Sequence, residues 1–368
     1  MTSDFVRRAD LEAAVQDCMV RYRHPLKLFG LSASTEYARQ VAGHLGVELV
    51  PHYETTFEDG ECYVKSCDGT VGNVRGHNVF VISSLYSDER DSVNDKFMKL
   101  AIFCGSLRQA SAHSITAVIP HWAYARQDQK DKSRAPVTTK ICAKMLEAVG
   151  VDRFLFMDVH NLAAVQNAFA MTTNIDNLEC KNLHAAWCAK ELRGMHRKLA
   201  VLSPDAGGLK RANKFRATLA HLLGVSEYEI ELAVLDKIRD PHTGKIDGGR
   251  IIGDVKDRLV IALDDMISTG GTIVRGCEAV ERHGGEVFAI CATHGLFAGE
   301  ANENLEKIDA RIVVADTVSP FRLNERNRMK LHIVNTSKMM ADAIRRIHSG
   351  TGSISALLEN LDNVYDQL

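Results

Sequence analysis

The residues best suited to do chemistry lie in one run, Val260-Ile-Ala-Leu-Asp-Asp-Met-Ile-Ser-Thr-Gly-Gly-Thr272. A buried strand is predicted to end at the paired acids Asp264 and Asp265, and the small residues after them open a helix. Backbone N–H groups of such a turn can close around a phosphate at the positive end of a helix. The two carboxylates repel phosphate, so they fit sugar hydroxyls or Mg²⁺ better. The alternative is an ordinary capped turn, but the paired acids and the doubled glycine favour a phosphate site.

A second candidate is the basic loop Tyr124-Ala-Arg-Gln-Asp-Gln-Lys-Asp-Lys-Ser-Arg-Ala-Pro136. Arg126 can stack on a base or pair with phosphate, and Lys130 and Arg134 can follow developing charge on a polyphosphate. A solvated surface loop is the alternative interpretation. The loop follows a predicted strand, and ligands of open α/β sheets bind at the carboxyl ends of strands, which favours a binding role.

Four further segments carry weaker signals. Phe57 to Glu61 is an acidic turn, which read alone is only a turn. Asp158 and His160 end a strand and could be metal ligands, although a hydrogen-bonded structural histidine fits equally well. Asp205 follows another strand in Ser-Pro-Asp-Ala-Gly-Gly. Lys237 and Arg239 share one face of a predicted strand and could stabilise a transferring phosphoryl group.

The composition bounds the partners and the compartment. The 368 residues include 45 Lys and Arg against 47 Asp and Glu, and the net charge of −2 gives no field that would attract nucleic acid or an anionic membrane. Nine scattered cysteines without a C-x-x-C pair indicate reduced thiols. No apolar run approaches the roughly 20 residues of a membrane span, and the acidic N-terminus does not resemble a targeting peptide. We therefore predict a cytoplasmic protein.

Strands and helices are predicted to alternate, and these elements must position the candidate residues. Apolar runs flanked by helical stretches indicate parallel sheets covered by helices, hence an α/β fold. The length favours two domains joined near residues 175–198. The predicted strands are 79–83, 115–119, 154–157, 199–202, 258–263, 287–291 and 312–315, and the predicted helices are 92–110, 138–149, 272–283, 337–348 and one from 209.

Together and in this order, the motifs resemble those of the ribose-phosphate pyrophosphokinase family, from about Lys27 to Leu358. The resemblance implies two phosphoribosyltransferase-like domains, each a mainly parallel sheet flanked by helices. It also implies transfer of the β,γ-diphosphoryl group of ATP to O1 of ribose 5-phosphate. The expected divisions are an N-terminal helical extension (1–25), an ATP-side domain (26–180), a ribose 5-phosphate-side domain (181–350) and a tail (351–368).

The resemblance also implies a role for each motif. The segment 57–61 would hold ATP, often from a neighbouring subunit, together with the basic loop, and His160 and Asp205 would lie near Mg²⁺. Lys237 and Arg239 would be catalytic. The ATP residues would be Phe57, Asp59, Glu61, Arg126, Gln127 and Asp128, and the ribose 5-phosphate residues Asp264, Asp265, Ser268, Thr269, Gly270, Gly271 and Thr272.

Some residues depart from the family pattern. Ser268 stands where many members have Asp, Gly270 replaces Ala, and Ile238 replaces a third cation. The stretch 169–174 leaves Asp176 as one of two expected acids, which bears on a second metal position.

The resemblance predicts ATP and ribose 5-phosphate as substrates, Mg²⁺ as cofactor, and a homo-oligomer built from dimers, with a hexamer as one form. Two alternatives stay open. A non-catalytic regulatory homologue would assemble with an active subunit, but it would be expected to have lost Lys237 or the basic loop, and both are present. A phosphoribosyltransferase would explain the paired acids but not the ATP motifs.

Overall fold

The computed structural model describes residues 24–236, 250–359, 361 and 364, which form two compact units. Unit 1 contains the described residues up to 156 together with 161–176 and 339–354. Unit 2 contains 157–160, the described part of 177–338, and the described residues after 354. Of the range 26–180, residues 157–160 and 177–180 cluster with unit 2, and of the range 181–350, residues 339–350 cluster with unit 1. Most of the extension 1–25 lies outside the described residues.

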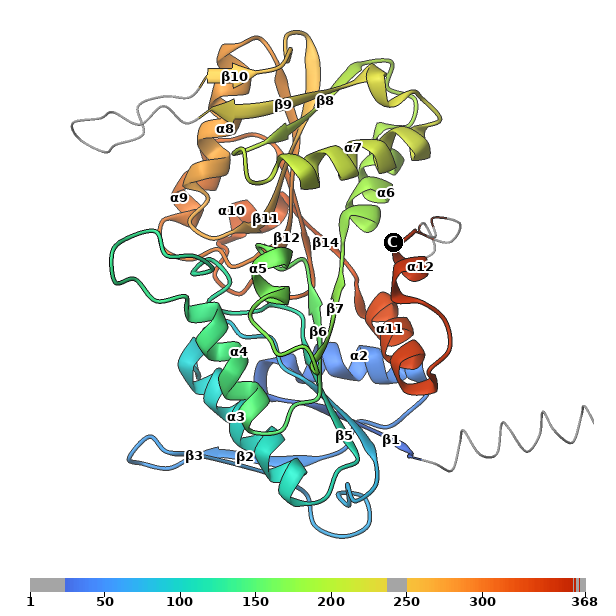
Figure 1. Ribbon diagram of the computed structural model, residues 1–368. Coiled ribbons are helices and arrows are strands. Elements are labelled where there is room, and N and C mark those ends of the chain that lie inside the picture. Colours follow the sequence, from blue (N-terminus) through green and yellow to red (C-terminus); the bar gives the residue numbers. More distant parts are fainter. Residues whose placement is uncertain (1–23, 237–249, 360, 362–363, 365–368) are drawn as a thin grey trace, which may run out of the picture. The chain divides into compact units, whose positions relative to one another are not determined.

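Unit 1 is built on a five-stranded sheet of order β1-β4-β5-β6-β7. The strands β1, β4, β5 and β6 pair in parallel. Helices α3 and α4 cover one face, and α2 and α11 lie on the other (Figure 1). The elements are β1 (Leu26–Gly30), η1 (Ser32–Ser34), α2 (Thr35–Leu45), β2 (His52–Thr56), β3 (Cys62–Ser66), β4 (Asn78–Ile82), α3 (Val93–Gln109), β5 (Ser114–Ile119), α4 (Thr138–Ala148), β6 (Arg153–Met157), α5 (Leu162–Gln166), β7 (Asn174–Leu178) and α11 (Ser337–Ser349).

Unit 2 is built on a seven-stranded sheet of order β10-β9-β8-β11-β12-β13-β14. Every pair is parallel except β10 with β9. Helices α6 and α7 cover one face, and α8 and α9 the other (Figure 1). The elements are α6 (Lys181–Leu192), β8 (Lys198–Ser203), α7 (Leu209–Leu223), η2 (Glu227–Glu229), β9 (Ile230–Asp236), β10 (Arg250–Ile252), β11 (Arg258–Ile267), α8 (Gly271–Arg282), β12 (Glu286–Gly295), α9 (Ala301–Leu305), β13 (Arg311–Ala315), α10 (Glu325–Met329), β14 (Leu331–Val334) and α12 (Ile354–Glu359).

The predicted α/β class with two mainly parallel sheets is confirmed. Each strand and helix predicted within the described residues has a counterpart, but β11 runs to Ile267, four residues beyond the predicted end. The extension follows from its neighbour, because β12 continues the parallel ladder as far as Ile267 opposite Gly295. Asp264 and Asp265 therefore belong to the strand, and they point to opposite faces of the sheet.

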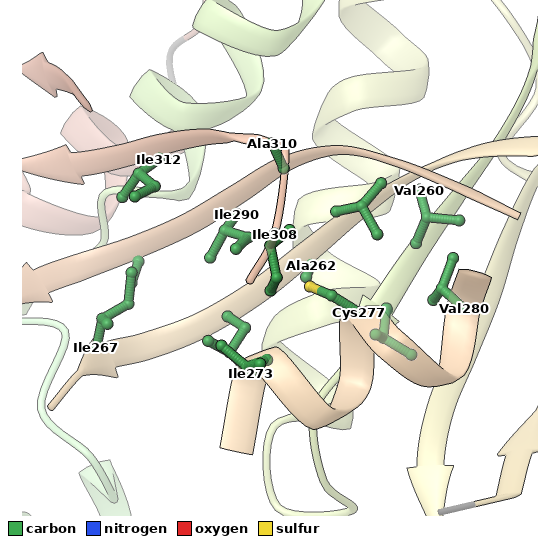
Figure 2. Packing of buried hydrophobic residues seen from close by; sticks show 14 of the residues in the cluster. Val260, Ala262, Ile267, Ile273, Cys277, Val280, Ile290, Ile308, Ala310 and Ile312 are labelled. Atoms are coloured by element: carbon green, nitrogen blue, oxygen red, sulfur yellow. The ribbon is translucent and has the colours of Figure 1, made fainter. Parts of the chain in front are cut away.

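A buried apolar layer fixes α8 against the sheet of unit 2. Figure 2 shows Ile273, Cys277 and Val280 of the helix facing Val260 and Ala262 of β11. Each of these side chains is at most 3% exposed. Because the interior is close-packed, the turn between β11 and α8 is held at both ends.

Two glycines of unit 1 give a matched test of packing. A Cβ on Gly30, at the end of β1, would lie 2.3 Å from Ala38 Cβ in α2, whereas a Cβ on Gly43 in the same helix meets nothing within 4 Å. We expect Gly30→Ala to lower the free energy of unfolding by about 1–3 kcal/mol, because the atoms nearest the new Cβ are the Ala38 Cβ and backbone atoms of Ser34 and Thr35, which cannot rotate away. Gly43→Ala should raise it by about 0.5–1 kcal/mol. Denaturant unfolding of both variants checks the pair, and equal effects of the two substitutions would contradict this packing.

Candidate functional site

The candidate site of unit 2 lies where parallel strands end at their carboxyl edge. Asp205 follows β8, and Asp264 and Asp265 lie near the end of β11, both strands of the unit 2 sheet. His160, which also belongs to unit 2, joins this edge through its contact with Asp265. The described part of unit 2 thus supplies an imidazole, three carboxylates and a small-residue turn at one edge. This edge is where ligands of parallel α/β sheets bind.

The centre of this site is a hydrogen-bonded pair of His160 and Asp265. His160 Nδ1 lies 2.8 Å from Asp265 Oδ2, and the Asp265 side chain is only 3% exposed. Arg211 Nη1 approaches the same carboxylate at 3.5 Å and Asp264 Oδ1 at 3.9 Å. The Arg211 guanidinium also donates to the His160 carbonyl, at 3.5 Å. Arg211 therefore links the histidine to both acids.

The two acids have opposite electrostatic environments. Burial alone would raise the pKa of Asp265, but the hydrogen bond with His160 and the charge of Arg211 outweigh it and hold that pKa well below its usual range. Burial, and then the negative charge of Asp265, raise the pKa of Asp264 well above its usual range. The pair therefore favours one negative charge, located on Asp265. A protonated Asp264 can donate a hydrogen bond as well as accept one.

The segment before His160 is anchored within unit 2 by buried polar groups. Asp158 Oδ2 accepts hydrogen bonds from the Cys180 N–H at 2.7 Å and from Thr293 Oγ1 at 2.6 Å. His294 Nε2 lies 3.1 Å from the Met157 carbonyl oxygen. Asp158 also holds a left-handed backbone angle, with φ of 41°. Asp158 thus has a structural role here, and His160 is the residue that this anchoring presents to Asp265.

The turn from Ser268 to Thr272 joins β11 to α8. Gly270 has a φ of 76° and caps α8, a conformation that glycine adopts without strain. The loop is braced from outside, since Asn304 Nδ2 donates to the Thr269 carbonyl at 2.9 Å and the Ala298 N–H donates to the Ser268 carbonyl at 2.9 Å. These bonds use carbonyl groups of the turn, and the first N–H groups of a helix such as α8 have no partner within the helix itself.

Asp205 lies in a second tight turn, between β8 and α7. The Gly208 N–H donates to Asp205 Oδ1 at 3.0 Å, and Ser203 Oγ donates to the Asp205 carbonyl at 2.7 Å. A Cβ on Gly208 would lie 2.7 Å from Ser203 Oγ, so the glycine permits the close turn. The helix that follows begins at Leu209 and carries Arg211 in its first turn.

The predicted ATP residues of unit 1 lie in two separate places. Phe57, Asp59 and Glu61 form the exposed tip of the β2–β3 hairpin, where Phe57 is 53% exposed. Arg126, Gln127 and Asp128 lie in the loop between β5 and α4. Figure 1 shows the hairpin and this loop well apart within unit 1.

The basic loop is tied to its surroundings by a few hydrogen bonds. Thr138 Oγ1 donates to Gln127 Oε1 at 2.6 Å, and Asn161 Nδ2 donates to Asp128 Oδ2 at 2.7 Å. Trp122, which is 2% exposed, donates from Nε1 to Thr139 Oγ1 at 2.9 Å and fixes the start of the loop. Arg126 is exposed at the surface.

Three of the residues singled out in the sequence are not found among the described residues of the site. Lys237 and Arg239 lie outside the described residues. Asp176 pairs with Arg153 at 2.6 Å and so forms a structural ion pair in unit 1.

The sequence alone gave Arg211 no role. The signal that could have indicated one was a cation in the first turn of a helix, where the helix dipole disfavours positive charge unless acids lie nearby. Among the described residues, no three His, Cys, Asp or Glu side chains form a group that could hold a metal ion.

Within residues 24–236 and 250–359, no helix has the length and apolar character that crossing a bilayer requires.

Comparison with known proteins gives a consistent result. The family model for the N-terminal domain of ribose phosphate pyrophosphokinase matches residues 26–150, and the one for the phosphoribosyl synthetase-associated domain matches residues 241–359. A ribose-phosphate pyrophosphokinase of Fusobacterium nucleatum is 34% identical over 334 residues, covering 90% of this chain and 98% of the relative. The chain belongs to the ribose-phosphate pyrophosphokinase family.

Further members of the ribose-phosphate pyrophosphokinase family agree. Ribose-phosphate pyrophosphokinase A of Dictyostelium discoideum is 32% identical, covering 91% of this chain and 98% of the relative. The crystal structure of phosphoribosylpyrophosphate synthetase from Mycobacterium smegmatis matches with a TM-score of 0.76 at 29% identity, covering 89% of this chain and 99% of that one. The predictions of family, fold class and an enzymatic function are thereby confirmed.

The buried acid Asp316 of unit 2 gives a prediction for the pH dependence of stability. Asp316 follows β13, its Oδ1 accepts from the Thr336 N–H at 3.0 Å and from Thr336 Oγ1 at 2.5 Å, and burial raises its pKa to about 6. Folding therefore favours the protonated form of Asp316. As pH rises from about 4 to about 6, the free energy of unfolding falls by about 3 kcal/mol, because the buried acid must then ionise or keep its proton at a cost. Asp316→Asn should remove this loss, so its Tm relative to the parent should be higher at pH 7 than at pH 4.

The exposed Asp309→Asn is the matched control for Asp316→Asn and should leave the pH dependence of Tm unchanged. If the Asp316→Asn and parent curves stay parallel from pH 4 to pH 7, Asp316 does not take up a proton on folding.

Proposed function

We propose that this chain is a ribose-phosphate diphosphokinase, which transfers the β,γ-diphosphoryl group of ATP to O1 of ribose 5-phosphate. The products are phosphoribosyl diphosphate and AMP, which would feed nucleotide biosynthesis. The observation that carries this proposal is family membership over 98% of the length of the Fusobacterium nucleatum relative. The site in unit 2 supports it, because β11 carries two acids with opposite pKa shifts and is followed by a small-residue turn that opens α8.

Ribose 5-phosphate binds, in this proposal, at the end of β11. The phosphate occupies the turn Ser268–Thr272 at the N-terminus of α8, where N–H groups and hydroxyls donate to its oxygens. Asp264 forms hydrogen bonds with the ribose hydroxyls. The raised pKa of its carboxyl group supports this role, because a protonated acid can both donate and accept a hydrogen bond. Asp265 is already bonded to His160 and Arg211, so it orients those groups and Asp264 receives the sugar.

ATP binds through the basic loop and the hairpin tip. Arg126 is exposed and free to stack on adenine or pair with phosphate, and Gln127 and Asp128 are held beside it by Thr138 and Asn161. Phe57 offers an exposed aromatic face for the base, with Asp59 and Glu61 for the ribose. Because the loop and the hairpin lie apart in one chain, we propose that the hairpin serves the ATP site of a second copy in a homo-oligomer built from dimers.

Mg²⁺ would enter as part of the ATP substrate complex. The ion commonly keeps several waters and takes one or two carboxylates plus substrate phosphates, so it does not need a cage of three protein ligands. Asp205, half-buried in its turn, and His160 at the edge of the same unit fit such a partial site. The ion supplies neutralisation of charge on the phosphate oxygens during transfer.

The reaction is an in-line displacement that needs positioning and charge rather than a covalent nucleophile. O1 of ribose 5-phosphate attacks the β-phosphorus and loses its proton, and the bond between that phosphorus and the oxygen bridging to the α-phosphate breaks. AMP leaves with the electron pair. Lys237 and Arg239 are proposed to neutralise charge on the transferring group.

A steady-state assay separates this function from the alternatives. The purified chain with ATP, Mg²⁺ and ribose 5-phosphate should form AMP and phosphoribosyl diphosphate in equal amounts. A regulatory homologue would form neither alone but would change the rate of an added active synthetase. A phosphoribosyltransferase would consume phosphoribosyl diphosphate when a nucleobase is supplied.

We propose the cytoplasm as the location. The eight cysteines in the described part of the chain are all free thiols, and six of them are buried, which fits a reducing compartment.

A further inference from the structure

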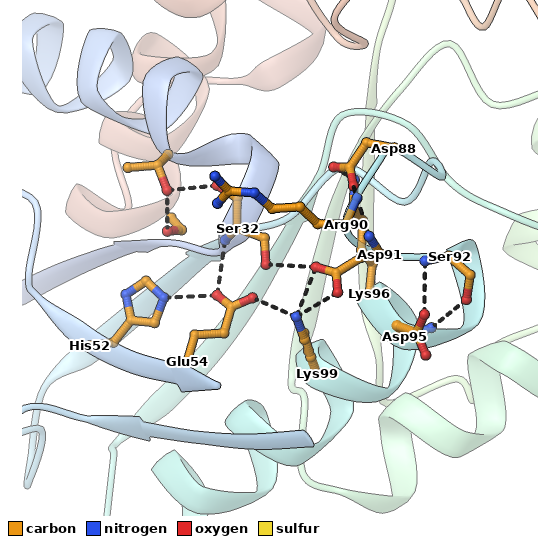
Figure 3. Close-up of polar contacts among 12 residues, drawn as sticks. Ser32, His52, Glu54, Asp88, Arg90, Asp91, Ser92, Asp95, Lys96 and Lys99 are labelled. Atoms are coloured by element: carbon orange, nitrogen blue, oxygen red, sulfur yellow. Dashed lines mark hydrogen bonds and ion pairs between the residues drawn. The ribbon is translucent and has the colours of Figure 1, made fainter. Parts of the chain in front are cut away.

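A buried lysine on α3 lies at the centre of a charge network in unit 1. Lys99 is 6% exposed, and its Nζ lies 2.8 Å from each carboxylate oxygen of Asp91. The same Nζ lies 3.3 Å from Glu54 Oε1. Figure 3 shows Lys99 pointing between the two acids, one from the loop after β4 and the other from β2.

Glu54 extends this network to the end of β1. Its Oε2 accepts a hydrogen bond from the Ser32 N–H at 3.0 Å and lies 3.1 Å from His52 Nε2 (Figure 3). Ser32 Oγ in turn donates to Asp91 Oδ2 at 3.4 Å. Three segments distant in sequence, at Ser32, at 52–54 and at 91–99, therefore meet at one carboxylate pair and one ammonium group.

The network lies at the base of the hairpin whose tip carries the predicted ATP residues. Glu54 lies on β2, three residues before Phe57, and β2 stays paired with β3 as far as Thr56 opposite Cys62. Beyond this point, the Phe57 N–H donates to the Glu61 carbonyl at 2.8 Å and closes the tip.

A hollow separates the tip of the hairpin from α3. The cavity measures about 490 Å³, and its walls include Thr56 and Glu61 of the hairpin and Asp95 and Met98 of α3. The tip is therefore not supported by close packing against the helix. Nearer the base, β3 packs against α3, and the Glu54–Lys99 pair adds a largely buried polar contact between the described part of the hairpin and α3. We take the direction of the tip to depend on these contacts.

We propose that Lys99 is a positioning residue: by holding Glu54 of β2 against Asp91, it sets the direction of the hairpin that presents Phe57, Asp59 and Glu61 to ATP. This inference rests on the proposed function. Lys99 itself touches neither substrate in this account. Its effect passes through Glu54 and the strand to the tip.

The chemistry of the network favours a directional role over simple stabilisation. Buried ion pairs gain little over apolar packing, because desolvation of both charges offsets their attraction. Without the ammonium group, however, the carboxylates of Glu54 and Asp91 lose the cation between them and repel each other. The strand that carries Glu54 can relieve that repulsion by moving away from Asp91, and the hairpin tip moves with it.

The test compares Lys99→Met with Lys96→Met in the full-length protein. Lys96 is a buried lysine of the same helix, but its ion pair at 2.6 Å joins α3 to Asp88 in the loop after β4. We expect Lys99→Met to raise the KM for ATP about 10-fold, the loss typical of a removed supporting contact, while the KM for ribose 5-phosphate changes less than 2-fold. Lys96→Met should leave both KM values within about 2-fold of the parent.

A readout independent of activity accompanies the kinetics. Hydrogen exchange of peptides covering 52–66 should be faster in Lys99→Met and unchanged in Lys96→Met. Lys99→Arg, which keeps the charge, should restore slow exchange and most of the ATP affinity. If Lys99→Met does not fold, Glu54→Gln replaces it, with the same direction and a smaller rise in the KM for ATP.

The outcomes distinguish this inference from the proposed function. An inactive parent refutes the proposed function, and with it the role toward ATP, whereas the exchange data still judge whether Lys99 anchors the hairpin. An active parent whose Lys99→Met variant keeps its KM for ATP within 2-fold overturns the positioning role. So does an equal rise in the KM for ATP in Lys96→Met.

Discussion

Asp265→Asn is expected to lower kcat/KM for ribose 5-phosphate by about 10- to 100-fold, the range seen when a group that orients a site residue is removed. The substitution keeps the shape of the side chain but removes the charge that holds His160 at 2.8 Å and Arg211 at 3.5 Å. It also removes the negative charge that, after burial, raises the pKa of Asp264, so the pKa of Asp264 should fall and its donor proton should be held less firmly. Steady-state kinetics with ribose 5-phosphate as the varied substrate measure the effect.

The control for Asp265→Asn is Glu286→Gln. Glu286 begins β12 in the same sheet, and its exposed carboxylate pairs with Arg197 at 3.0 Å. We expect this exposed pair to contribute little, with kcat/KM within 2-fold of the parent. A folded Asp265→Asn enzyme with kcat/KM within 2-fold of the parent would show that the acid pair does not organise the site.

Lys237→Ala is expected to lower kcat by about 100- to 1,000-fold, the loss typical of one group that stabilises transition-state charge. Lys237 comes directly after β9, in which Val234 pairs with Ser203, two residues before Asp205. The described strand β9 therefore ends at the same sheet edge as β8, which Asp205 follows. The KM for ATP should change little, because the charge that Lys237 neutralises develops during transfer.

Lys256→Ala is the control for Lys237→Ala, since Lys256 is an exposed lysine near the other end of β11. Lys237→Arg should retain part of kcat because it keeps the charge. Turnover of Lys237→Ala within a few-fold of the parent would remove the cationic pair from the proposed mechanism.

The local features of the fold were predictable from the sequence. Runs such as 115–119 and 154–157 are apolar on both faces, so they predict parallel strands covered by helices, and the structure has them as β5 and β6. The turn Ser268–Thr272 was predictable because a run of small residues between a predicted strand and a predicted helix is typical of a phosphate-binding turn. Gly270 indeed has the left-handed conformation that such a turn requires.

Features that depend on contacts between distant residues could not be predicted. The link from His160 to Asp265 spans 105 residues, and no local pattern indicates that it exists. The pattern also gave no reason to separate the adjacent Asp264 and Asp265, whose different environments arise from burial, His160 and Arg211. The same holds for Lys99 and Glu54, and for residues 339–354, which cluster with unit 1 although they follow unit 2 in the chain.

The most direct test of the central claim follows the β-phosphorus of ATP. The purified chain is incubated with Mg²⁺, ribose 5-phosphate and ATP labelled with ³²P at the β-position, and the products are separated by chromatography. We predict that all transferred label appears in phosphoribosyl diphosphate, with unlabelled AMP formed in equal amount and no labelled ADP. Label retained in ADP would indicate transfer of a single phosphoryl group, and label left entirely in ATP would indicate no transfer. Either result would contradict the proposed diphosphokinase.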